Sequence, residues 1–155
     1  MRKTEAERYW VKVEKTDECW IWTATVTSWG YGQFWLNGKH VKAHRYSFEL
    51  AHGPIAEGLD IDHLCHNRAC VRPEHLRAAT RKQNMENRKG ADSDNYSGVR
   101  GVHWHKAARK WQAHVRHNGH LHYVGTFSSK EDAELAVVAK RNELFTHNDH
   151  DRKAA

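Results

Sequence analysis

Residues 62–76 read DHLCHNRACVRPEHL, and this stretch decides the fold of the first half of the chain. The strand-like alternation of Leu59 to His63 leads into a polar loop from Leu64 to Glu74. His75 to Ala79 is typical of a second short strand, and Thr80 is a good cap for a following helix. The pattern therefore predicts a strand–loop–strand–helix unit.

Three side chains in this unit have the chemistry needed to hydrolyse a phosphodiester bond. A neutral imidazole such as that of His63 can take a proton from water near pH 7. A carboxylate and an amide oxygen, from Asp62 and Asn84, form a hard-oxygen pair suited to a hydrated Mg²⁺ or Mn²⁺ ion that neutralises phosphate charge. An Asp-His pair is also common by accident, so the residues alone leave a purely structural role open.

The three cysteines indicate a second metal site. Cys65, Cys70 and His75 are spaced as in a tetrahedral structural zinc site that lacks one ligand. Cys19 would complete it, use every cysteine in the chain and pin the long loop to the N-terminal sheet; His66 is the alternative fourth ligand. The other interpretation is three reduced, half-buried thiols, since three cysteines form no even disulfide framework.

With Gln83-Asn84 in its helix, this unit resembles the HNH endonucleases of the homing-endonuclease-like, ββα-metal class. The resemblance implies that His63 activates water and that Asp62 and Asn84 bind the catalytic metal. The middle position of the motif, which is Asn in the simplest members, is His75 here. This departure puts the loop-bracing role of that residue in doubt and suggests a different one.

Residues outside the motif extend the resemblance. His44 and Arg45 match a pair that such proteins carry upstream of the motif, where they would support the active site; a surface pair at a strand end is the alternative. Arg72, Arg81 and Lys82 surround the predicted site. Beside a nuclease motif we expect them to contact phosphate, although a charge run is usually a solvated face.

The residues before the motif predict several short elements. Thr4 and Glu7 have the spacing of a capping box before a short helix. The other expected elements are strands at 19–23, 33–36 and 39–43, a hairpin turn at Asn37-Gly38, and a helix at 46–52.

Composition limits the classes of protein to which the chain can belong. It has 155 residues, 25 Lys+Arg against 19 Asp+Glu, and 14 histidines. No apolar run approaches the ~18 residues of a membrane span, and the first ten residues lack the apolar core of a secretory leader. We therefore expect a cytoplasmic protein whose partner is a polyanion, and the resemblance to HNH endonucleases implies a bacterial or phage-infected host cell.

The C-terminal part has a different pattern. Strand-like runs at 98–105, 110–117 and 120–127 include an Asn118-Gly119 turn, and an amphipathic helix follows to about Phe145. On the middle strand, Trp111, Ala113 and Val115 share one face, so the opposite face is open to DNA. The charged tail after residue 146 is expected to fray. A small sheet with an ordinary basic face is the alternative.

This part resembles the Apetala/ethylene-response-factor DNA-binding domain through Ser97 to Val102, Lys110-Trp111, Val124 to Phe127 and Glu131 to Ala133. The same domain occurs fused to HNH nucleases of phages and mobile introns. The resemblance implies DNA contacts by the strand residues Arg100, Trp104, Lys106, Arg109, Lys110, Trp111, His114 and Arg116.

The predicted fold is α+β. A zinc-stabilised ββα-metal domain (1–90) is followed by a linker (91–96), a three-stranded antiparallel sheet with one helix (97–147) and a tail (148–155). The predicted function is metal-dependent cleavage of double-stranded DNA, of the homing or phage type. One such centre cuts one strand, so a double-strand break needs a homodimer or a second event. The alternatives are a DNA-binding regulator with an inactive zinc module, and an RNA-binding protein.

Overall fold

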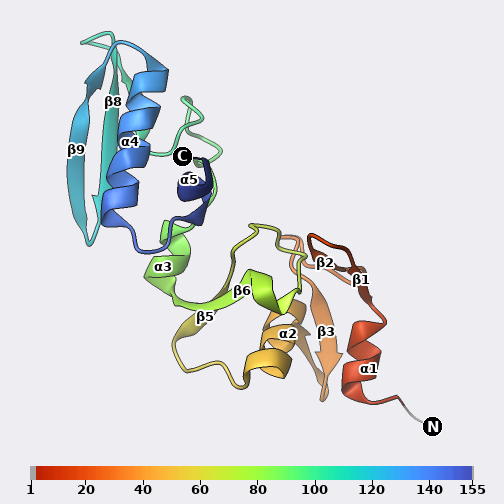
Figure 1. Cartoon of the computed structure of the whole chain (residues 1–155). Coiled ribbons are helices and arrows are strands. Elements are labelled where there is room, and N and C mark those ends of the chain that lie inside the picture. Colours follow the sequence, from red (N-terminus) through yellow and green to blue (C-terminus); the bar gives the residue numbers. More distant parts are fainter. Residues whose placement is uncertain (1–2, 155) are drawn as a thin grey trace. The chain divides into compact units, whose positions relative to one another are not determined.

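The computed structural model describes residues 3–154 and divides the chain into two compact units, the first ending at Asn84 and the second beginning at Met85 (Figure 1). The division falls earlier than the predicted boundary at residue 90, within the helix that follows the motif. None of the helices in residues 3–154 is both long and apolar enough to cross a membrane.

The first unit is made of short elements in three separate antiparallel hairpins, β1–β2, β3–β4 and β5–β6. In chain order its elements are α1 (Glu5–Trp10), β1 (Val13–Lys15), β2 (Trp20–Trp22), β3 (Gln33–Leu36), β4 (Lys39–Lys42), α2 (Ala43–His52), β5 (Leu59–His63), the 3₁₀ turn η1 (Pro73–His75), β6 (Leu76–Thr80) and α3 (Arg81–Glu86).

Aromatic side chains form the core of this unit. Tyr9 on α1 is fully buried, its ring lies 5.0 Å from that of Trp22 and 5.2 Å from that of Phe34, and its hydroxyl donates to the carbonyl of Ala43 at 2.9 Å. The predicted capping box of Thr4 and Glu7 is present at the start of α1. Capping and aromatic packing together fix a helix too short to be stable alone.

The Asn37-Gly38 turn between β3 and β4 is confirmed, with φ of 47° and 79° at its two residues. Helix α2 begins at Ala43, three residues earlier than predicted. The N–H of Ala43 donates to the carbonyl of Gly32 at 2.8 Å, and a Cβ at Gly32 would lie 2.7 Å from the ring of Trp22. Glycine is therefore required where the chain before β3 meets the start of α2.

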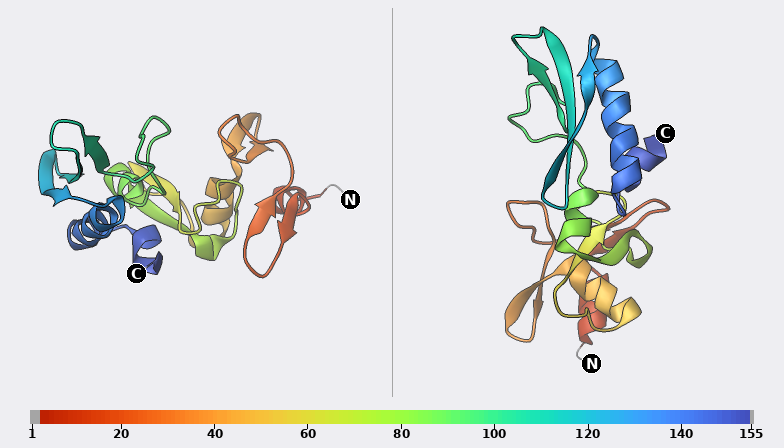
Figure 2. Two further views of the ribbon diagram at one scale, coloured as in Figure 1. Left: turned by 90° about the horizontal axis from the view of Figure 1, so that it is seen from above. Right: turned by 90° about the vertical axis from the view of Figure 1, so that its left-hand side faces the viewer.

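The second unit is a three-stranded antiparallel sheet in the order β7-β8-β9, and α4 covers one face of it (Figure 2). Its elements are β7 (Val102–His105), β8 (Lys110–His117), β9 (His120–Phe127), α4 (Lys130–Leu144) and α5 (Asp149–Ala154). The Asn118-Gly119 turn is confirmed by its positive φ angles, and Ser129 caps α4 by accepting from the N–H of Asp132.

The core of the second unit is mainly aliphatic, with Phe145 as its buried aromatic residue. Ala113 and Val115 of β8 are buried against Ala133 and Val137 of α4. The face predicted to pack from its period-2 pattern is the face that packs, despite an irregularity in register between Ala113 and His114.

Two predictions for this unit are wrong. The strand expected from residue 98 begins at Val102, because Gly101 has φ of 85° and lies so close to β8 that a Cβ would lie 2.4 Å from the carbonyl oxygen of His114. The tail expected to fray contains α5, because the buried guanidinium of Arg141 donates to Asp151 at 2.6 Å and holds the tail in place.

Candidate metal centre and active site

The β5–β6 hairpin positions the central pair of the predicted active site. Asp62 lies directly opposite Arg77 in the register, and His63 lies opposite Leu76. Arg77 donates two hydrogen bonds, of 2.9 and 3.1 Å, to Oδ2 of Asp62, whose side chain is 8% exposed. Sequence reasoning missed Arg77; its cross-strand position was the available signal, since opposite charges often pair there.

The contacts of His63 define which of its nitrogens is basic. Its ring is buried, and Nε2 lies 3.1 Å from the carbonyl oxygen of Cys70. A carbonyl only accepts, so Nε2 carries the proton and Nδ1 carries the lone pair in the neutral ring. Burial lowers the pKa of His63, and the Cys70 carbonyl opposes this only in part. The imidazole is therefore a neutral base at pH 7.

A second buried histidine packs against the first. The rings of His44 and His63 are 4.7 Å apart, and Tyr31 lies 5.3 Å from His44. Burial lowers the pKa of His44 to about 2, and its Nδ1 has no hydrogen-bond partner among residues 3–154. Tyr31 was not predicted. Arg45, predicted to act with His44, instead donates to the carbonyl of Leu59 at 3.5 Å, at the opposite end of β5 from His63.

Asn84 is the fourth residue of α3 and is half-buried. The start of α3 has the predicted cap: Gln83 N–H donates to Oγ1 of Thr80, and Thr80 N–H donates to Oε1 of Gln83. The structure packs His44 against His63 and pairs Asp62 with Arg77, and among the described residues it records no hydrogen bond that joins Asn84 to Asp62 or His63.

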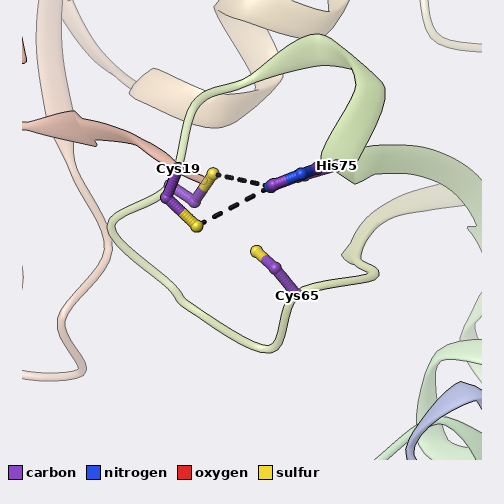
Figure 3. A group of neighbouring side chains, drawn as sticks. Cys19, Cys65 and His75 are labelled. Carbon is purple, nitrogen blue, oxygen red and sulfur yellow. Dashed lines mark hydrogen bonds between the residues drawn. The ribbon is translucent and has the colours of Figure 1, made fainter. Parts of the chain in front are cut away.

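Cys19, Cys65, Cys70 and His75 form a compact group, with all four ligand atoms within 4.8 Å of one another. Figure 3 shows Cys19, Cys65 and His75 directed toward a common centre. Nδ1 of His75 lies 3.7 Å from Sγ of Cys19 and 3.6 Å from Sγ of Cys70. A tetrahedral zinc ion at ordinary bond lengths needs about 3.6 Å between sulfur and nitrogen, so these distances fit a Cys₃His site.

Backbone pairing between β2 and the motif loop brings Cys19 to the other three ligands. The N–H of Val71 donates to the carbonyl of Trp20 at 2.7 Å, and the N–H of Trp22 donates to the carbonyl of Ala69 at 2.9 Å. Cys19 precedes β2, so this pairing places it beside Cys70. His66, the alternative fourth ligand, is not in the group.

The thiols of the group cannot all ionise without a cation. Hydrogen bonding from Cys70 lowers the pKa of Cys65 to about 4, with help from the N–H of Asn67. That same interaction with Cys65 raises the pKa of Cys70, and burial raises that of Cys19. Because a single thiolate holds its neighbours protonated, an ion such as Zn²⁺ would be needed to make all three ligands anionic.

Comparison with known proteins identifies a domain largely within the first unit. Residues 41–86 match the model of the HNH endonuclease family. Protein 3.8 of Escherichia phage T7 is 32% identical to the chain over 117 residues, which cover 76% of this chain and 91% of protein 3.8. Residues 41–86 therefore form an HNH endonuclease domain, and the chain as a whole is related to protein 3.8.

The chain has other viral relatives. Protein 7.7 of Escherichia phage T7 is 41% identical over 70 residues, which cover 45% of this chain and 54% of protein 7.7. An uncharacterized HNH endonuclease, L560 of Acanthamoeba polyphaga mimivirus, is 30% identical over 117 residues, covering 75% of this chain and 59% of that protein. The chain thus spans only about half the length of protein 7.7. No solved structure matches the chain.

Two arginines predicted to bind DNA are engaged in internal hydrogen bonds. Arg72 donates to the carbonyls of Asp17 and Glu18 at 2.6 and 2.8 Å and so holds the turn before Cys19. Arg100 donates to three backbone carbonyls, those of Met85, Glu86 and Arg88. Arg100 is accordingly half-buried.

The remaining predicted DNA contacts fall into two groups. Arg81, Lys82, Lys106, Arg109, Lys110 and Arg116 are exposed. Trp104 and Trp111 are cross-strand partners, with rings 5.1 Å apart, and Trp111 packs against the core under α4. His114 lies on the opposite face, stacked on His103 at 4.9 Å. The open face of the sheet is therefore histidine-rich and basic, with the tryptophan pair on the helix side.

Proposed function

We propose that the protein is a metal-dependent endonuclease that hydrolyses phosphodiester bonds of duplex DNA, with His63 as the general base. The observation that carries the proposal is the hydrogen bond between Nε2 of His63 and the carbonyl of Cys70, inside a segment that matches the HNH family. It leaves Nδ1 as the basic atom of a buried imidazole that stays neutral at pH 7. A histidine that only packed in the core would not need to keep one ring nitrogen available as a base.

The residues divide the chemistry among them. Nδ1 of His63 takes the proton from the attacking water, while packing against His44 holds the ring in place. Asp62 and Asn84 would hold a divalent cation such as Mg²⁺ or Mn²⁺, since a carboxylate and an amide oxygen are the donors that such ions prefer. When bound, that cation supplies positive charge to the phosphate and the departing oxygen. Arg77 orients the Asp62 carboxylate.

The Cys₃His group would hold a separate structural Zn²⁺. It offers four ligands and no open position, which is the pattern of a structural rather than a catalytic zinc site. The zinc would act on the reaction indirectly, because the Cys70 carbonyl that fixes His63 belongs to a ligand residue. The second unit would bind the target duplex through its exposed cations.

Cleavage of supercoiled plasmid tests the proposed function. We expect nicking with Mg²⁺ or Mn²⁺ and none with EDTA. His63→Ala should lower the rate about 100- to 10,000-fold with little change in DNA binding, the range expected for loss of a general base. His52→Ala, an exposed histidine of α2, is the matched control and should leave the rate unchanged. Equal cleavage by the His63 and His52 variants would refute the assignment.

The alternative function is a DNA-binding regulator with an inactive HNH domain. The observation in its favour is the Asp62–Arg77 ion pair, which already neutralises the carboxylate proposed as a metal ligand. The same assay separates the two, because a regulator retards the plasmid in a gel but does not cut it with any divalent cation.

A further inference from the structure

The loop between β2 and β3 carries a tryptophan at its tip whose exposure the active-site chemistry does not explain. Trp29 is 73% exposed, whereas the aromatic residues Tyr9, Trp22 and Phe34 of the same unit are buried in its core. Within the described chain, its indole makes no ring contact and no side-chain hydrogen bond. Packing therefore does not account for a tryptophan at this position.

The loop is a firm support for that side chain. The N–H of Gly30 donates to the carbonyl of Thr27 at 2.9 Å, and Thr27 N–H donates to the carbonyl of Tyr31 at 2.8 Å. Gly30 has φ of 82°, and Val26 and Gly32 form an antiparallel bridge that closes the loop. A closed, hydrogen-bonded turn presents an exposed ring with little loss of conformational entropy on binding.

The base of the same loop lies against the candidate general base. The ring of Tyr31 is 6.1 Å from the ring of His63. Arg68, from the loop between the zinc-site cysteines, donates to the carbonyl of Trp29 at 3.1 Å, and its guanidinium lies 5.6 Å from the ring of Tyr31. Nζ of Lys42 lies 5.2 Å from the centroid of the same Tyr31 ring. Two cations thus flank the path from His63 to Trp29.

These features match what a deformed DNA duplex would require. An exposed ring on a rigid turn stacks on a nucleobase or wedges between base pairs, and neighbouring cations hold the phosphates on either side. We propose that Trp29 inserts into the base stack of the DNA next to the phosphate attacked by the water that His63 deprotonates, and so opens the duplex for cleavage. This inference rests on the proposed endonuclease function and identifies the residue that would position its substrate.

The test compares cleavage of two end-labelled duplexes with Mg²⁺, one fully paired and one with a mismatch beside the mapped cut. Trp29→Ala should cut the paired duplex about 10-fold or more slowly than wild type, the size expected for loss of one stacking contact. On the mismatched duplex the deficit should shrink to less than about 3-fold, because the bases there are already unstacked. Trp29→Phe should retain most of the rate.

Trp35→Ala is the matched control, since Trp35 is 49% exposed in the same unit but packs on His40 at 4.9 Å and should not affect cleavage. Two results would overturn the inference while the wild type still cuts, which would leave the proposed function standing. One is an unchanged cleavage rate for Trp29→Ala, and the other is an equal loss of rate on both duplexes. Failure of the wild type to cut either duplex would overturn both.

Discussion

The two units of the protein are stabilised by different means. The second has strands of eight residues, β8 and β9, and an aliphatic core between sheet and helix. The first has hairpins with strands of three to five residues and relies on an aromatic cluster around Tyr9 and on the Cys₃His group. Short hairpins bury little surface, so a cross-link is needed to hold the motif loop where catalysis requires it. We therefore expect the first unit, which contains the candidate active site, to depend on a metal ion for its stability.

Removal of the proposed metal should have the largest effect on stability, and it should act on the first unit alone. Cys70→Ser, or a strong zinc chelator, should lower the unfolding free energy of the first unit by more than about 5 kcal/mol, because metal binding and folding of such a site are one equilibrium. The second unit should keep its unfolding transition. Amide hydrogen exchange resolved by segment measures both units in one sample, and elemental analysis should find about one zinc per wild-type chain.

The second unit serves as the internal control for that experiment. If amides of β8 lose protection together with those of β5, the two units do not differ as proposed. If the Cys70→Ser chain keeps its zinc and the protection of β5, the Cys₃His group is not a structural metal site.

Much of the local structure was predictable because local chemistry determines it. Asn37-Gly38 and Asn118-Gly119 could only turn the chain back, and the strands on either side of each turn form as predicted. Thr4 and Ser129 cap the helices that follow them. The tail was mispredicted because the interaction that orders it, between Arg141 and Asp151, joins two residues on different elements and leaves no periodic pattern.

The residue types of the candidate site were predictable from the motif, and the fourth ligand of the Cys₃His group was predictable by elimination. Cys19 was predicted as a ligand because no other cysteine remained, and the structure places it with the other three. Arg77 was missed although its cross-strand position opposite Asp62 was an available signal, whereas the role of Tyr31 could not be seen, since it depends on a tertiary neighbour. The internal hydrogen bonds of Arg100 were not predicted, because a basic residue in a strand-like run is expected to face solvent. Nothing in the local pattern indicates that its guanidinium binds backbone carbonyls of the same unit.

A buried ion pair gives the next largest effect and should be confined to the second unit. Asp151→Asn removes the partner of Arg141, whose side chain is 7% exposed, and should lower the unfolding free energy of that unit by about 3 kcal/mol. Burial of the Asp151 carboxyl raises its pKa, but hydrogen bonding and charge from Arg141 outweigh this, so the pKa lies below 3.8.

The sign of the pH dependence follows from that lowered pKa. A carboxyl with a depressed folded-state pKa contributes stability above its unfolded-state pKa, and that contribution is lost as pH falls through the folded-state value. Wild-type second-unit stability should therefore decline below about pH 4, whereas Asp151→Asn should show a shallower decline. Parallel acid-unfolding curves for the two proteins would contradict this role for the carboxylate.

The aliphatic core of the second unit gives a smaller, metal-independent effect. Val137→Ala removes two methyl groups from a fully buried position on α4 and should cost about 2 kcal/mol in that unit. Leu135→Ala is the matched control on the same helix, since Leu135 is 71% exposed and should change stability by less than about 0.5 kcal/mol. Zinc content should be unaffected in both, and a fall in zinc content of the Val137 variant would mean that the two units are not stabilised independently.

The smallest effect tests whether the aromatic cluster of the first unit contributes beyond its buried area. Nζ of Lys15 lies 4.0 Å from the ring centroid of Trp20 and 4.9 Å from that of Trp10. Lys15→Met keeps an apolar stem but removes the charge, and should lower the unfolding free energy of the first unit by about 0.5 to 1 kcal/mol, as expected for an exposed cation–π contact. A chemical-denaturation midpoint measured with zinc bound resolves a change of this size. An unchanged midpoint would mean that burial of the rings alone accounts for the cluster, which would leave the Cys₃His group as the main support of the motif loop.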